Sequence, residues 1–147
     1  MPDNAPFPHV TADAAPAMAP PARRPAHWPI VLLRALAVLV LLQVFLQAVL
    51  AGGFITGKVT FLGLHSANGV FLVLSSMALP VAAVLLVRPG RGPWWPIVFG
   101  VVLWLLIGVQ VGIGFARLVG LHIPIGMAIM ALSAGLTWWA FAYRTKR

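Results

Sequence analysis

Residues 66–87 read SANGVFLVLSSMALPVAAVLLV, an apolar run without a single charged side chain. A helix needs about 20 such residues to cross the roughly 30 Å hydrocarbon core of a membrane. Three further runs of comparable length cover residues 30–54, 96–115 and 123–143. These runs lack the alternation of apolar and polar residues that is typical of strands, and they are too few to close a β-barrel. The sequence therefore predicts an all-α fold, a bundle of four transmembrane helices.

The composition limits the chemistry of this membrane protein. Hydrophobic residues make up 61% of the chain and charged residues 8%, which is too little polar surface to cover a soluble globule. The two acidic residues, Asp3 and Asp13, lie near the N-terminus, and there is no cysteine. These facts exclude carboxylate acid–base pairs, intramembrane acidic proton relays and thiolate ligands. They favour a non-enzymatic function and disfavour an ion-coupled transporter.

The N-terminal segment differs from the rest. Residues 1–28 are rich in Pro and Ala and have no periodicity, so we expect a disordered cytoplasmic tail before a transmembrane domain at residues 29–147. The first apolar run is too long for a cleavable signal peptide and should remain as an anchor.

Basic residues predict the orientation in the membrane. Most of them lie before or early in the first apolar run, between the second and third runs, and at the C-terminus: Arg23, Arg24, Arg34, Arg88, Arg91, Arg144, Lys146 and Arg147. Such clusters stay on the cytoplasmic side, so both termini should be cytoplasmic, in a bacterial inner membrane. The net charge of +8 then reflects the topology and attracts the protein to membrane lipid. We expect no nucleic acid as partner.

Two histidines carry the functional signal. His65 and His122 each occur in the frame Gly-Leu-His-x-x-x-Gly, next to the second and fourth apolar runs. At about 1.5 Å per residue, their distances from Arg88 and Arg144 give nearly equal depths. The two imidazoles are therefore expected to face each other near the outer surface. The repeated frame also predicts two tandem helical hairpins that arose by duplication.

Two neutral imidazoles without carboxylates or thiolates suit the axial ligation of a b-type haem inside a four-helix bundle. The other candidate cofactor-binding residues share the outer level of the bundle. Glycines one turn after each histidine leave room for a flat macrocycle, cations in the outer loops pair with propionates, and amides hydrogen-bond a ligand. These residues are Gly69 and Gly126, Lys58 and Arg117, and Gln47 and Gln110.

At these residues the chain resembles one four-helix half of the haem A synthase family, whose haem-ligating histidines stand at the outer ends of the second and fourth helices. His65 and His122 match those positions, and the resemblance covers residues 30–143. It implies a haem-binding scaffold. The Glu that this family has just before its first histidine is absent, because Leu62, Gly63 and Leu64 stand there, and the outer cysteines are missing. These departures speak against the synthase reaction. The chain also resembles small uncharacterised four-helix membrane proteins of bacteria, a likeness that implies no activity.

Alternative interpretations remain open at this stage. The histidines also fit helix-end polar groups in a small accessory subunit or structural bundle without a cofactor. Met127 and Met130 also fit a soft-metal path for Cu(I). Partners beyond lipid, whether a redox protein, a quinone or a second copy of the chain, are not specified by the sequence.

Three sequence features predict local structure. Gly108 and Gly112 form a GxxxG motif typical of close helix packing. Pro80 predicts a kink, and Pro124 a proline in the first turn of a helix.

Overall fold

The computed structural model describes residues 27–144, which contain helices and no strand. The helices are α1 (Trp28–Ile55), α2 (Thr60–Ser76), α3 (Ala78–Val87), α4 (Trp95–Phe115) and α5 (Val119–Ala142). Since α2 and α3 form one continuous span, four spans are long and apolar enough to cross a membrane. The predicted fold is confirmed, and the chain is a multi-pass membrane protein. Most of the predicted tail, residues 1–26, lies outside the described part, but its predicted end at residue 28 is placed too late, because α1 already begins at Trp28 with His27 as its N-cap.

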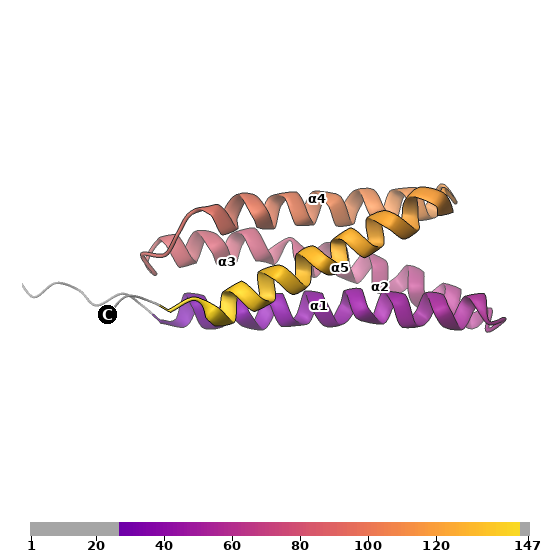
Figure 1. Ribbon diagram of the computed structural model, residues 1–147, viewed down its shortest axis with the longest axis horizontal. Helices are drawn as coiled ribbons and strands as arrows, with labels where there is room; N and C mark the ends of the chain where they lie inside the picture. Colours follow the sequence, from indigo (N-terminus) through magenta and orange to yellow (C-terminus); the bar gives the residue numbers. More distant parts are fainter. Residues whose placement is uncertain (1–26, 145–147) are drawn as a thin grey trace, which may run out of the picture.

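The four spans form a bundle with two distinct ends (Figure 1). The start of α1, the α3–α4 connection and the end of α5 lie at one end, here called the terminal end. The α1–α2 and α4–α5 loops, residues 56–59 and 116–118, lie at the other, here called the loop end. Within residues 27–144, α2 does not closely approach α5, nor α1 approach α4. These two pairs therefore occupy the diagonals of the bundle.

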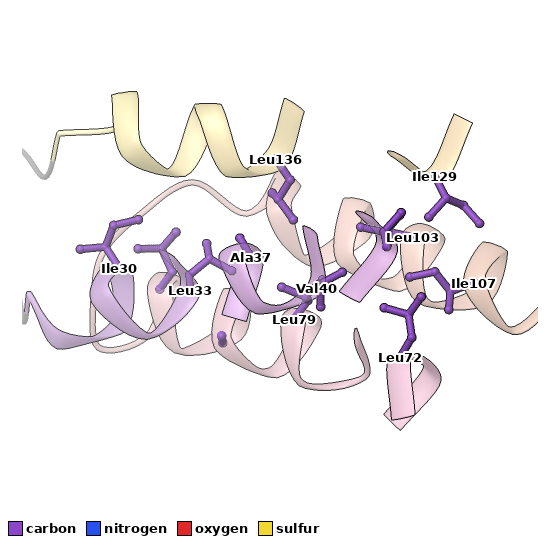
Figure 2. Packing of buried hydrophobic residues seen from close by; sticks show 13 residues of the cluster. Ile30, Leu33, Ala37, Val40, Leu72, Leu79, Leu103, Ile107, Ile129 and Leu136 are labelled. Atoms are coloured by element: carbon purple, nitrogen blue, oxygen red, sulfur yellow. The ribbon is translucent and has the colours of Figure 1, made fainter. Parts of the chain in front are cut away.

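Buried residues of both hairpins pack together in one core (Figure 2), and their positions repeat from one hairpin to the other. Leu72, Ser76, Leu79 and Ala83 are buried on α2 and α3, and the residues 57 positions later, Ile129, Ser133, Leu136 and Ala140, are buried on α5. Likewise Leu33, Ala37, Val40 and Val44 on α1 correspond to Pro96, Gly100, Leu103 and Ile107 on α4, 63 positions later. The two hairpins thus present equivalent faces to one shared core, as the repeated frame predicts.

The second span breaks where Pro80 predicts a kink. Proline has no N–H to bond the carbonyl four residues earlier, which here belongs to Ser76, and α2 ends at that residue. The kinked segment is crossed closely by α4 at Gly100. A Cβ at Gly100 would lie 3.0 Å from the Pro80 nitrogen and 3.2 Å from its Cα. The missing side chain is what lets α4 approach the break.

Two of the predicted helix starts are wrong. α2 begins at Thr60 rather than at residue 66, and α5 begins at Val119 rather than at residue 123. Both histidine frames therefore lie inside helices, and Pro124 lies in a helix interior instead of a first turn. The physical cause is the tightness of the turns at the loop end, which leaves few residues outside the helices.

The two turns at the loop end have the same hydrogen-bond pattern. α1 ends with Gly57 in the left-handed region (φ +95°), and the N–H of Lys58 donates to the carbonyl of Gly53 at 3.1 Å. α4 ends with Arg117 at φ +58°, and the N–H of Leu118 donates to the carbonyl of Ile113 at 3.1 Å. This is the Schellman arrangement, which caps a helix and reverses the chain within a few residues.

The GxxxG motif does not pack against a neighbouring helix within the described residues. A Cβ at Gly108 or at Gly112 would meet no atom within 4 Å, so no neighbouring helix packs against either glycine. The prediction of close packing at this motif is therefore wrong within residues 27–144. The two glycines lie on a face of α4 that the fold leaves open.

Arg34 joins α1 to the end of α5, a contact that the sequence does not reveal. Its Nε donates to the carbonyl of Ala140 at 2.9 Å and its Nη2 to that of Tyr143 at 3.0 Å. Its guanidinium carbon lies 5.4 Å from the centre of the Phe141 ring. The last carbonyls of a helix lack partners within the helix, and a cation there also complements the helix dipole.

We therefore expect Arg34→Ala to lower the free energy of unfolding by about 1–3 kcal/mol, because two charge-assisted hydrogen bonds are lost. Unfolding by SDS titration in mixed micelles measures this change. Arg34→Lys keeps the charge but not the two-point contact and should fall between wild type and Arg34→Ala. Equal stability of all three proteins would contradict the capping role.

Candidate functional site

The two histidines meet inside the bundle near the loop end. The ring centroids of His65 on α2 and His122 on α5 are 6.0 Å apart, and the ring planes are inclined by 58°. Both side chains are half-buried. α2 and α5 lie on a diagonal of the bundle, and their backbones do not approach each other closely. The two imidazoles therefore occupy the interior between these helices.

Each imidazole is held by a backbone carbonyl of its own hairpin. The Nδ1 atom of His65 is 3.1 Å from the carbonyl oxygen of Gln47, and the Nδ1 atom of His122 is 3.1 Å from that of Gln110. A carbonyl oxygen only accepts, so in both rings Nδ1 carries the proton and donates it. In a neutral imidazole the lone pair is then on Nε2. Neither Nε2 has a hydrogen-bond partner within residues 27–144.

The same contact is made by hairpins of different length. His65 follows Gln47 by 18 residues, whereas His122 follows Gln110 by only 12. Counted from the left-handed residues Gly57 and Arg117, each arm of the second hairpin is three residues shorter, about one helical turn. Removing a turn from both arms leaves the glutamine and the histidine opposite each other. The contact between histidine and glutamine is thus kept, although the loop of the second hairpin lies about one helical turn closer to it.

The glycines of the frame receive the glutamine side chains. A Cβ at Gly69 would lie 2.9 Å from Nε2 of Gln47, and one at Gly126 would lie 3.0 Å from Nε2 of Gln110. The space beside these glycines, predicted to leave room for a macrocycle, is therefore filled at these two points by amides. Gln110 Nε2 also donates to the carbonyl of His122 at 2.7 Å. The Oε1 atoms of both glutamines are buried without a partner among the described residues.

The two predicted loop cations lie at the same end of the bundle, on its surface. Lys58 and Arg117 are both exposed, and Lys58 Nζ lies 5.4 Å from the centre of the Phe61 ring. Because the first hairpin is a turn longer, Lys58 stands further from the histidines along the bundle than Arg117 does. The structure brings the histidines, glutamines and glycines together, whereas these two cations lie on the surface at the loop end.

One residue of the site was missed by sequence reasoning. A Cβ at Gly114 would lie 2.9 Å from Cε1 and 3.1 Å from Nδ1 of His122, so the imidazole rests against this glycine. Gly114 follows Gln110 by four residues and shares its helix face, a spacing that could have identified it.

The described residues offer no larger metal-ligand set. Within residues 27–144 no group of three or more His, Cys, Asp or Glu side chains comes together. Met127, a candidate for a copper path, is 70% exposed and so lies on the outside of the bundle. The two imidazoles therefore form a pair of possible ligands without a third such side chain beside them in the described part of the chain.

Comparison of the chain with models of known families, with curated proteins and with solved structures finds no match.

Proposed function

We propose that this membrane protein binds one b-type haem through His65 and His122 and serves in electron transfer or haem handling. The observation that carries the proposal is the facing pair of imidazoles, 6.0 Å apart between centroids, each with Nδ1 bonded to a carbonyl. That hydrogen bond fixes the ring and leaves Nε2 as the ligand atom, an arrangement common among metal-binding histidines.

The spacing fits one metal ion between the rings. Metal–imidazole bonds are about 2 Å long, so rings whose centroids are 6.0 Å apart would leave room for one ion that both Nε2 atoms would hold. Two protein ligands suffice for haem because the porphyrin supplies four nitrogens. A bare zinc or copper ion would need further protein ligands, and the described residues offer no third His, Cys, Asp or Glu nearby.

The surrounding residues suit this group in two ways. Lys58 and Arg117 supply cations for haem carboxylates at the loop end. The buried, unpaired Oε1 atoms of Gln47 and Gln110 offer hydrogen-bond acceptors to water or to a protonated carboxyl. Bound there, haem supplies a one-electron iron couple. Both acidic residues of the chain lie within residues 1–26, so no side-chain carboxylate of the span region would stabilise the oxidised, more positive iron.

We further propose a bacterial inner membrane with both termini in the cytoplasm and the histidines near the outer face. Support comes from Arg88, Arg91 and Arg144 near the terminal end. Exposed tryptophans at the same end suit a membrane interface: Trp28, Trp94 and Trp138.

A reduced-minus-oxidised visible spectrum of the full chain, purified in mild detergent from haem-supplied cells, tests the proposal. Sharp Soret and α bands at one haem per chain are expected. A folded but colourless protein would overturn it and favour the second candidate, a structural bundle. That alternative also accounts for the Nδ1 contacts, as hydrogen bonds that merely join the two helices of each hairpin.

Gly114 gives a sharper test of the ring position. Gly114→Val should push the His122 ring out of line and weaken haem binding about tenfold, as changes beside metal ligands commonly do. Gly112→Val is the matched control, because a Cβ at Gly112 meets nothing within 4 Å. Haem titration of the apoprotein measures both affinities. Equal loss in the two variants would show that the effect is not mediated by His122.

A further inference from the structure

The loop between α3 and α4, residues 88–94, carries two arginines that the fold does not use as helix caps. The last four carbonyls of α3 (Ala78–Val87) have no partner inside the helix. Each of them accepts a hydrogen bond from a backbone N–H of the loop, at 2.7–3.1 Å; the donors are Arg88, Gly90, Arg91 and Gly92. At the end of α5 the side chain of Arg34 fills this role. The side chains of Arg88 and Arg91 therefore call for another explanation.

The loop packs so closely against α3 that it fixes the backbone of both arginines. A Cβ at Gly90 would lie 2.5 Å from the carbonyl oxygen of Leu86, and one at Gly92 would lie 2.6 Å from Leu86 Cγ. Arg91, between these glycines, has φ +56°, a left-handed conformation that disfavours residues other than glycine. An arginine thus stands where a third glycine would be more stable.

The exposed side chains of the loop suit the boundary between lipid headgroups and hydrocarbon. Arg88 and Arg91 are exposed, and the Arg88 side chain has no partner within residues 27–144. That part of the chain contains no acidic residue to balance the two charges. Trp94, at the other end of the loop, is 68% exposed, and tryptophan is enriched at membrane interfaces.

Apolar side chains continue from Arg88 along one face of α3. Val84 and Val81 precede Arg88 by four and seven residues, a spacing that places all three on the same side of the helix. The two valines are 49% and 59% exposed, and they face lipid if this span crosses the membrane. A cation beside an apolar stripe complements an amphiphile with an anionic head and acyl chains.

We propose that Arg88 and Arg91 bind the headgroup phosphate of an anionic phospholipid whose acyl chains lie against α3. A guanidinium group can hold a phosphate through two parallel hydrogen bonds. The same arginines also favour one orientation in the membrane, but orientation requires only charge. It does not require an arginine in a left-handed conformation within a closely packed loop. This lipid site is independent of haem.

Native mass spectrometry of the full chain in mild detergent tests this proposal, because detergent removes the charged bilayer surface and leaves only lipid bound to the protein. Phosphatidylglycerol is expected to bind at least about tenfold more tightly than phosphatidylcholine, since each arginine near an anionic lipid contributes about 1 kcal/mol. Arg88→Gln should weaken phosphatidylglycerol binding about fivefold, which corresponds to that contribution.

Arg91→Gly separates lipid binding from folding. This variant removes the left-handed arginine and should be at least as stable as wild type in SDS titration. It should nevertheless weaken phosphatidylglycerol binding about fivefold, as Arg88→Gln does. Unchanged lipid binding in Arg91→Gly would contradict the role of this arginine.

Arg144→Gln is the matched control. Arg144 is exposed at the same end of the bundle and carries the same charge, but it follows α5, which does not closely approach α3 within the described residues. This variant should bind lipid like wild type. Equal affinity for the two lipids, or equal losses in Arg144→Gln and Arg88→Gln, would overturn the proposal and reduce the effect to net charge. Displacement of phosphatidylglycerol by an equal concentration of inorganic phosphate would also overturn it, because the loop would then bind the ion rather than the lipid.

Discussion

Replacing either His65 or His122 by alanine is expected to reduce bound haem more than tenfold. The two rings are 6.0 Å apart, and each hairpin contributes one of them. In the proposed haem site, losing one imidazole would leave the iron with a single protein ligand. This is a larger change than the loss of a residue that supports a ligand, which already costs about 10- to 100-fold in affinity. The haem-to-protein ratio of purified variants, from the Soret band and the pyridine haemochrome, measures this loss.

The matched control for this experiment is His27→Ala. His27 precedes α1 at the terminal end, whereas the site lies near the loop end, at the opposite end of the bundle. This variant should retain full haem. Both site variants must also remain folded by circular dichroism, so that lost colour reports ligation. Full colour in either His65→Ala or His122→Ala would refute axial ligation by that pair.

A large loss of stability is expected from Gly100→Val. A side chain here meets backbone atoms of Pro80 at 3.0–3.2 Å, and a helix backbone cannot rotate away as a side chain can. To make room, α4 and α3 must move apart near the α2–α3 junction. This separation should lower the free energy of unfolding by about 1–3 kcal/mol, the usual cost of overpacking. SDS-induced unfolding measures the change.

Gly108→Val, two turns along the same helix, is the control for this variant. A Cβ there meets no atom within 4 Å, so its stability should stay close to that of wild type. If both substitutions were equally costly, the loss would come from placing valine in α4 rather than from the contact with Pro80.

The differences between sequence and structure have two causes. Helix ends depend on where the chain reverses, and Gly57 and Arg117 reverse it so tightly that α2 and α5 begin early. A single Gly or Arg does not reveal such a turn. The open face at Gly108 and Gly112 likewise depends on which way α4 is turned about its axis.

The sequence by itself determined the four apolar spans, the kink at Pro80 and the repeated frame around His65 and His122. These follow from hydrophobic length, a missing N–H and local spacing, all of which are properties of short stretches of chain. Only the tertiary structure decided that the imidazoles face each other at 6.0 Å with Nδ1 on the carbonyls of Gln47 and Gln110. It also decided that glutamine amides fill the places beside Gly69 and Gly126. Such contacts depend on the rotation and crossing of helices distant in sequence, which the packing of the whole bundle sets.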